Sequence, residues 1–437
     1  MGRLLFFSKG RDMFENYIKE MVETRRALHR RPELGWTEFE TTWYVCSHLE
    51  KWGIPYLLGT QVINPKFVMG RDEKAVKDAI DRAKKHGVPA DFIEKTEGYT
   101  GAAAIIETGR PGPVTALRCD MDALPVRESD SPDHLPAKLG FASERPGLMH
   151  ACGHDGHTAV GLEVARWIHE HKEEFCGTIK ILFQPAEEGV RGGLPMSESG
   201  IVDDVDWLLG SHVGGVLHSG EVCVQDGGFM ASTKFDIEFT GQEAHAGSDP
   251  QKGHSALVAA ACATMMLQGI PRHREGETRV SVGKLVAGEG RNIVAAHALM
   301  QMEVRGGTQA VNDFMVDNVN RIIEAVETAY QVKAKITRVG ETSTLVVCPP
   351  LLDKVEEAMR AVPGIKILPR YHGADGSEDC SWLIRKVASH GGQAGFFLYG
   401  CEQKGHHRPD FEIQDETNLP IAFKIFLSFV KLINQRH

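Results

Sequence analysis

Thr178-Ile179-Lys180-Ile181-Leu182-Phe183 is the stretch that decides the fold class. Its apolar character continues with little alternation, which is typical of a strand buried on both faces of a sheet. A helix is predicted before it at 158–172, and two short apolar runs, Ala102–Glu107 and Val114–Arg118, read as strands joined by a Gly- and Pro-rich turn. Strands that alternate with helices predict an α/β sheet. In such sheets, reactive groups gather beyond the carboxyl ends of strands.

The flanking segments continue this pattern toward both termini. Apolar residues recur at helical spacing over 13–31, and the Arg31-Pro32 pair ends that helix. The charged segment 71–96 is helix-prone and is interpreted as a surface insertion. Four further elements complete the α/β part: a helix from Thr41 to Trp52, a helix at 350–361, the apolar run Ala394–Tyr399 and an amphipathic helix at 416–434.

A different pattern begins near Gly227-Gly228. Residues 234–241 alternate as a half-exposed strand does, and elements follow at 252–269 (helix), 278–287 and 297–305 (strands), 309–329 (helix) and 331–339 (strand). The order βαββαβ is the ferredoxin-like pattern. We therefore predict a catalytic domain formed by 1–227 and 342–437, with an α+β domain inserted at 228–341.

Composition restricts the classes of function. The 437 residues exceed one ordinary core, and 42% hydrophobic with 25% charged residues are globular values. A formal net charge of −10 opposes general attraction to nucleic acid or anionic membrane. The apolar run Leu4–Phe7 is too short for a signal peptide, and no run approaches a membrane span. Nine scattered cysteines suit reduced thiols, so a cytoplasmic protein is expected.

The segment Met149–His157 carries the strongest chemical signal. It holds three histidines, one cysteine and one aspartate within nine positions. In an extended loop, residues two apart point the same way, so Cys152 and His154 can share a metal ion. The alternative is a polar loop with a chance histidine cluster.

Glu187 and Glu188 follow the predicted strand at 178–183. At a strand end two adjacent carboxylates can diverge, one onto a metal and the other onto the water that attacks an amide. The alternative is a solvated acidic turn.

Other candidates also follow apolar runs. Asp120 and Asp122 could fix the tautomer of a metal-binding imidazole or could cap the next segment. His212 follows Trp207–Leu209, and the pair His406-His407 follows the run that ends at Tyr399. Taken alone, a histidine in such a position is more often a packed residue than a metal ligand.

Six separated motifs together resemble the aminoacylase/carboxypeptidase superfamily of two-metal amidohydrolases, in the branch that contains auxin-conjugate hydrolases and bacterial N-acyl-amino-acid amidohydrolases. The motifs are Arg-Pro-Glu-Leu-Gly at 31–35, Asp-Met-Asp-Ala-Leu-Pro at 120–125, His-Ala-Cys-Gly-His-Asp at 150–155, Gln-Pro-Ala-Glu-Glu-Gly at 184–189, Ala-His-Ala at 244–246, and His407 with Phe411. The resemblance spans nearly the whole chain. It implies a mixed-sheet, exopeptidase-like catalytic domain with an inserted ferredoxin-like domain.

The resemblance also assigns roles. It implies two divalent ions per subunit, with manganese favoured and zinc possible, bound by Cys152, His154, Glu188, His212 and His407. His407 is preferred to His406 because the family's ligand stands four residues before a Phe, here Phe411. Glu187 is implied as the general base, with Asp120 as a supporting catalytic residue. Relatives use the equivalent of His245 in the active site of the other protomer to stabilise the oxyanion, which implies a homodimer formed through the inserted domain.

By the same matching, Asn292 and Arg305 would bind the substrate carboxylate, and Arg291 a side-chain carboxylate. The expected substrates are N-acyl amino acids, particularly aromatic acyl-glutamates or acyl-aspartates, with the indole-acetyl conjugates as one alternative. Two other possibilities stay open: a non-catalytic protein that binds such conjugates, and one half of a hetero-oligomer with a homologous second subunit.

Overall fold

A computed structural model describes residues 14–373 and 376–436. Its larger sheet contains β1 (Tyr56–Leu58), β2 (Ala102–Glu107), β3 (Val114–Asp120), β4 (Thr178–Gln184), β5 (Trp207–Val213), β6 (Glu221–Gln225), β13 (Lys366–Ile367) and β14 (Gln393–Tyr399). The strand order is β1-β2-β4-β3-β5-β14-β6-β13. The central strands β4, β3, β5 and β14 are parallel. β1 and β2 pair antiparallel with their neighbours, and β6 is antiparallel to β14 but parallel to β13. The predicted α/β class with a mixed sheet is confirmed.

The β2–β3 turn does not make a hairpin. β4 lies between the two strands, antiparallel to β2 and parallel to β3. Parallel strands need a long crossover connection, and α6 (His154–Glu170) lies within the one between β3 and β4. From Ile179 onward β4 is buried, as its continuous apolar run predicts.

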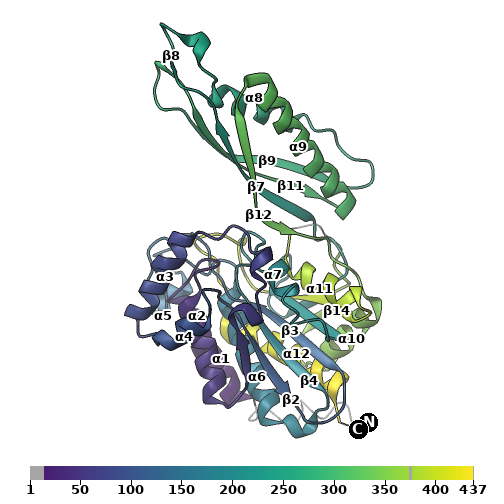
Figure 1. The fold of residues 1–437 in the computed structure, drawn as a ribbon. Helices are drawn as coiled ribbons and strands as arrows, with labels where there is room; N and C mark the ends of the chain where they lie inside the picture. The colour runs from purple at the N-terminus through teal and green to yellow at the C-terminus, as the bar shows by residue number, and fades with distance from the viewer. Residues whose placement is uncertain (1–13, 374–375, 437) are drawn as a thin grey trace.

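Helices cover both faces of this sheet (Figure 1). They are α1 (Glu15–His29), α2 (Phe39–Lys51), α3 (Glu73–Lys85), α4 (Ala90–Lys95), α5 (Leu135–Leu139), α6, α7 (Gly193–Ser197), α10 (Pro349–Arg360), α11 (Cys380–Ser389) and α12 (Asp415–Asn434). Successive residues of β3 identify the two faces. Cys119 faces Gly161 of α6, whereas Arg118 bonds to Asp379, the residue before α11. The segment predicted as a surface insertion forms α3 and α4, with Val76, Ala79 and Ala83 buried.

The second sheet belongs to the inserted part of the chain. It contains β7 (Ala231–Thr240), β9 (Thr278–Ala287), β11 (His297–Gly306) and β12 (Lys333–Thr342), in the order β12-β7-β11-β9 and with every neighbouring pair antiparallel. Helices α8 (Ala256–Gln268) and α9 (Gln309–Tyr330) pack on one face, and a separate hydrophobic core lies between helices and sheet. The ferredoxin-like βαββαβ pattern is confirmed.

The inserted sheet projects away from the larger one (Figure 1). The positions of β7 that face away from its helices are polar: Lys234, Asp236 and Glu238. A small two-stranded ribbon, β8 (Ala244–His245) with β10 (Ile293–Val294), lies at its outer end. Within the described ranges, no helix combines the length and the apolar character of a membrane span. The run Leu4–Phe7 and the first residue of the predicted helix at 13–31 lie outside the described residues.

Candidate metal centre and active site

The parallel strands deliver the candidate residues to one edge of the larger sheet. β3 ends at Asp120, β5 ends one residue after His212, and the segments after β4 and β14 carry Glu187-Glu188 and His406-His407. Because β3, β4, β5 and β14 are parallel, their carboxyl ends meet at the same edge.

Cys152 and His154 reach this edge from the turn that starts α6. Gly153 between them has φ +95°, a left-handed conformation that favours glycine. A Cβ atom there would stand 2.5 Å from Cγ1 of Val213. The glycine therefore allows the turn to pack against the end of β5 while its two neighbours point into the site.

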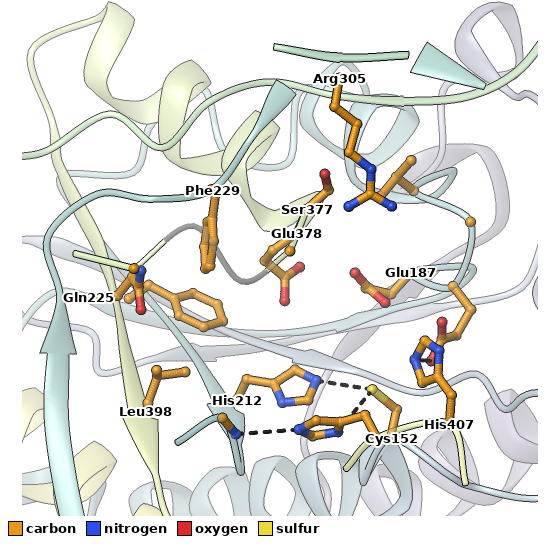
Figure 2. A pocket seen from close by; sticks show the side chains of 18 of the residues that line it. Cys152, Glu187, His212, Gln225, Phe229, Arg305, Ser377, Glu378, Leu398 and His407 are labelled. Carbon is orange, nitrogen blue, oxygen red and sulfur yellow. Dashed lines mark hydrogen bonds and ion pairs between the residues drawn. The ribbon is translucent and has the colours of Figure 1, made fainter. Parts of the chain in front are cut away.

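All five predicted ligands converge, and Figure 2 shows three of them, Cys152, His212 and His407. Three groups of side chains offer ligand atoms that lie within 4.8 Å of one another: Cys152, Glu188 and His407; His154, Glu187 and Glu188; and Asp120, His154, His157 and His212. The Sγ atom of Cys152 is 3.5 Å from Nε2 of His212, which links the groups. His407 adopts a positive φ of 61°, and its Nε2 lies 3.4 Å from Oε1 of Glu188.

Asp122 organises two parts of this cluster. Its Oδ1 lies 3.3 Å from Nδ1 of His154, and its two oxygens accept the backbone N–H groups of Glu187 and Glu188 at 3.0 Å each. This interaction leaves Nε2 of His154 directed at the cluster, where it has no hydrogen-bond partner among the described residues. Of the two aspartates proposed to orient an imidazole, Asp122 is the one that contacts Nδ1 of His154.

Asp120 has different partners. It accepts hydrogen bonds from Nδ1 of His157 and from Nη1 of Arg118, both at 2.5 Å. The other ring nitrogen of His157 accepts the N–H of Val213 at 3.1 Å. His157 therefore uses both nitrogens within the protein and is a support for Asp120 rather than a candidate ligand, although it lies close enough to be one.

A cation fits the electrostatics of the cluster. Burial and the nearby carboxylates of Glu188 and Glu187 raise the pKa of the Cys152 thiol well above its ordinary value. Burial, with Glu378 and Glu188, likewise raises the pKa of Glu187. Oε1 of Glu188 is buried and has no hydrogen-bond partner within the described part of the chain, although Nε2 of His407 lies 3.4 Å away. A thiolate and carboxylates this close together repel one another, and the imidazole nitrogen lacks a hydrogen-bond partner. A bound divalent ion would neutralise the negative charges and coordinate the imidazole.

The cluster forms one side of a cavity of about 420 Å³. Glu187 and Glu188 line it, and Lys234 and Arg305 reach it from the inserted sheet. Phe229, Phe396, Leu398 and Tyr371 also line it. The site is thus a pocket that combines candidate metal ligands, a basic wall and an apolar surface.

Comparison with known proteins identifies the family. The model of peptidase family M20/M25/M40 matches residues 116–432. The chain belongs to this family. It is therefore a hydrolase of the metallopeptidase type, and the resemblance read from the six motifs is confirmed.

Several relatives align with nearly the whole of this chain. A Haemophilus influenzae homolog of one of the subunits of p-aminobenzoyl-glutamate hydrolase is 41% identical, over 95% of this chain and 98% of the relative. The indole-3-acetyl-aspartic acid hydrolase of Enterobacter agglomerans is 39% identical over 93% and 94% of the two chains.

Solved structures agree. The aminobenzoyl-glutamate utilization protein of Klebsiella pneumoniae has a TM-score of 0.81 at 32% identity, over 96% of this chain and 98% of that chain. A dinuclear metal-binding M20 peptidase of Bacillus subtilis has a TM-score of 0.66 at 25% identity, over 96% and 98%.

Three predicted residues of the M20 site lie elsewhere in this protein. His245 is exposed on β8, and Arg291 and Asn292 are exposed beside β10, all at the outer end of the inserted domain (Figure 1). None of the three lines the cavity at the metal cluster. Arg305 alone of the predicted substrate-binding residues does so.

Sequence reasoning missed a buried charge network beneath Glu187. Arg118, which is fully buried, bonds to Asp120 and pairs with Glu378 at 2.9 Å and Asp379 at 3.3 Å. Glu378 lines the cavity. The adjacent acids at 378–379, like those at 187–188, were a signal that could have been noticed.

Two histidines close in sequence to the predicted ligands, His406 and His150, have surroundings that the sequence did not predict. His406, set aside in favour of His407, has its Nδ1 3.6 Å from Sγ of Cys152, while its Nε2 lies 3.1 Å from Nε2 of Gln403. His150 is buried, and neither ring nitrogen has a hydrogen-bond partner among the described residues. Burial lowers its pKa to about 4, so it packs as a neutral ring.

Proposed function

We propose that the protein is a divalent-metal-dependent amidohydrolase that cleaves aromatic N-acyl-glutamates or N-acyl-aspartates, with p-aminobenzoyl-glutamate as the first substrate to test. One observation carries the proposal: the same cavity combines the candidate metal cluster, two cationic side chains and five apolar or aromatic side chains. An acyl amino acid needs these three surfaces, because it has an amide to hydrolyse, a carboxylate to bind and an acyl group to bury. The names of the most similar relatives support the choice of acyl group.

The proposed metal ligands are Cys152, His154, Glu188, His212 and His407, arranged for two ions. The dinuclear relative supports the number of ions. Thiolate and imidazole suit zinc, whereas carboxylate oxygens suit manganese, and this set is mixed. We favour manganese on the family resemblance. Metal analysis of protein purified without added ions, followed by chelation and restoration with each metal alone, tests the assignment.

Bound at this cluster, the ions would polarise the amide carbonyl and acidify water in the site. Glu187 is the proposed general base: it takes a proton from the attacking water and returns it to the leaving amine. A raised pKa suits both halves of this role, because the carboxyl group must hold the proton between the two transfers. Arg118 and Glu378 lie behind Glu187 and form part of its electrostatic environment.

Arg305 and Lys234 are proposed to bind the substrate carboxylates. They lie on neighbouring strands of the inserted sheet, and Glu303 sits between them, 2.7 Å from Nζ of Lys234 and 2.8 Å from Nη2 of Arg305. Glu303 balances only one of the two positive charges, so the side of the cavity formed by Lys234 and Arg305 keeps a net positive charge. That charge supplies the local attraction that an acid substrate needs in a chain of net charge −10.

A homodimer formed through the inserted domain, which we propose spans 228–341, would complete the site. The face of α8 carries exposed Leu257, Val258, Met265 and Met266, and the edge strand β9 exposes Leu285 and Val286. Exposed apolar side chains gathered on a helix and an unpaired sheet edge favour association with a second copy. In such a dimer, His245 and Asn292 of one protomer are proposed to act in the pocket of its partner, with Arg291 beside them.

Mixing two inactive variants tests the shared site. Glu187→Gln damages the pocket and His245→Ala damages the residue donated to the partner. If each pocket uses the partner's His245, co-refolded heterodimers regain one intact site and up to about a quarter of normal activity appears in a statistical mixture. A monomeric active enzyme, or no recovery on mixing, would contradict the proposal.

The substrate proposal is tested with a panel. Hydrolysis of p-aminobenzoyl-glutamate, indole-3-acetyl-aspartate and simple N-acyl amino acids is compared by kcat/KM, with and without chelator. Binding without hydrolysis under every metal would favour the alternative of a non-catalytic binding protein. Activity that appears only after a second, homologous chain is added would favour a hetero-oligomer, because the name of the Haemophilus relative describes it as a homolog of one subunit of its enzyme.

A further inference from the structure

The cavity has an apolar end that lies away from its charged residues. Figure 2 shows Phe229, Leu398 and Gln225 on one side of the cavity, and Arg305, Glu187 and His407 on the other. Phe229 packs edge-on against Phe396 with ring centroids 5.3 Å apart. If the amino-acid carboxylates bind at Arg305 and the amide lies at the metal cluster, the acyl group extends toward this apolar end.

Gln225 is the polar residue of that end. It is the last residue of β6, pairs in register with Phe396 of β14, and is 1% exposed. Its Nε2 donates a short hydrogen bond to the carbonyl oxygen of Gly227. Because a carbonyl oxygen can only accept, this bond fixes which end of the amide is nitrogen and which is oxygen.

The amide oxygen of Gln225 is therefore an acceptor of known identity that lacks a donor within the described part of the chain. Oε1 is buried and has no hydrogen-bond partner among the described residues. A buried acceptor without a donor is destabilising, and native structures rarely keep one without a reason. Since Gln225 lines the cavity, a ligand in the cavity can supply the donor.

We propose that Oε1 of Gln225 accepts a hydrogen bond from an N–H group on the aromatic ring of the acyl group. This inference rests on the proposed function and narrows its substrate class to aromatic acyl groups with a ring-borne donor remote from the carbonyl. A p-aminobenzoyl group carries such a donor in its amino group, and an indole-acetyl group carries one in its ring N–H. An unsubstituted benzoyl group carries none, so it fills the apolar end and leaves Oε1 unpaired.

The decisive experiment compares two substrates in two proteins, all loaded with metal. The substrates are 4-aminobenzoyl-glutamate and 4-methylbenzoyl-glutamate, which have similar size and differ in the donor. An amino group also changes the reactivity of the carbonyl, so the measured quantity is the change in the kcat/KM ratio between wild type and Gln225→Met. We expect the amino-to-methyl ratio to fall about 10- to 100-fold in the variant, the usual cost of leaving a buried polar group unpaired.

The matched control is Gln268→Met, the same substitution at an exposed position on α8 outside the cavity. It should leave the ratio unchanged. Because Gln225 is buried, thermal melting of the variant checks its folding, and hydrolysis of the methyl substrate at near wild-type kcat/KM shows that the metal cluster is intact. An unchanged ratio in a folded Gln225→Met variant would overturn the inference.

Binding of the free acids separates failure of this inference from failure of the proposed function. Calorimetry with 4-aminobenzoate and 4-methylbenzoate requires no turnover. Tighter binding of 4-aminobenzoate to wild type, lost in Gln225→Met, supports the inference even if no conjugate is hydrolysed. Equal binding of the two acids to both proteins overturns it even if hydrolysis is fast.

Discussion

Oδ1 of Asp122 lies 3.3 Å from Nδ1 of His154, while the same carboxylate holds the backbone N–H groups of Glu187 and Glu188. One side chain therefore orients an imidazole from the start of α6 and also fixes the loop after β4 that carries the proposed base. A hydrogen bond to the outer nitrogen of a ligating histidine sets its tautomer and orientation. If His154 binds a metal as proposed, Asp122 couples that binding to the position of Glu187.

Asp122→Asn should weaken metal binding by roughly 10- to 100-fold, the usual effect of removing such a support. The amide offers one oxygen where the carboxylate offers two, so it can no longer accept both backbone N–H groups and orient His154. Competition with a metal-binding dye measures the affinity. Asp133→Asn, at an exposed position, is the control; equal affinity in the two variants would remove Asp122 from this role.

Glu187→Gln should retain both ions and lose turnover by about 10²- to 10⁴-fold, which is the usual contribution of a general base. The amide has nearly the shape of the carboxyl group but cannot take a proton from water. Metal analysis and kcat with a saturating acyl-glutamate check the two parts separately. Near-normal kcat would exclude Glu187 as the base, and loss of metal would instead make it a ligand.

Cys152→Ser should weaken metal binding and weaken it more for zinc than for manganese. A thiolate is the softest ligand of the proposed set, and soft ligands favour zinc over manganese. Titration with each metal in turn gives the ratio of affinities. Cys262→Ser, in the inserted domain and away from the cavity, should leave both affinities as they are. A parallel fall for the two metals would argue that Cys152 does not bind the metal directly.

Arg305→Met should lower kcat/KM for an acyl-glutamate by about 10-fold or more, mainly through KM, because a charge-assisted hydrogen bond to the substrate is lost. Glu303 accepts from Nε and pairs with Nη2 of Arg305, so both N–H groups of Nη1 and the second N–H of Nη2 remain for a ligand. Lys234→Met should act in the same direction. Lys335→Met, an exposed change on β12, provides the comparison; an effect on kcat alone would indicate a structural rather than a binding role.

Glu163→Gln should stabilise the protein at alkaline pH and have little effect near pH 5. Burial raises the pKa of Glu163 from 4.5 to about 8, so between these values the folded protein holds a proton that the unfolded chain has released. Stability linked to this group is present below pH 4.5 and is lost as the pH rises through 8. The gain in Tm should be roughly 2 °C or more at pH 8.5.

Melting curves of both proteins at pH 5 and pH 8.5 measure this difference. Glu23→Gln, at an exposed position on α1, controls for the loss of one negative charge. An equal gain at the two pH values would show that Glu163 does not change its ionisation in this range.

Local patterns in the sequence were sufficient for these secondary-structure elements and for the grouping of Cys152 with His154. The apolar run at 178–183, the period-2 alternation at 234–241 and the helical spacing at 309–329 each report burial of one face or both, and each became the predicted element. Cys152 and His154 were predicted for the same kind of reason, because two residues of one loop have a fixed local geometry. Their convergence with Glu188, His212 and His407 followed from the family resemblance.

Other features depend on contacts between distant segments, which no local pattern encodes. That β4 lies between β2 and β3 is decided by the crossover through α6. Asp120 and Asp122 are two residues apart, yet Asp120 bonds to His157 and Asp122 contacts His154. Which imidazole each aspartate contacts is decided by the tertiary structure. The unpaired oxygen of Gln225 exists only because Gly227 takes its amide nitrogen and the fold buries the oxygen. The sequence by itself determined which elements form and which chemical groups they carry, because backbone preference and the pattern of burial are local properties. Only the tertiary structure decided which partners those groups have, because hydrogen bonds and ion pairs form between residues that folding brings together.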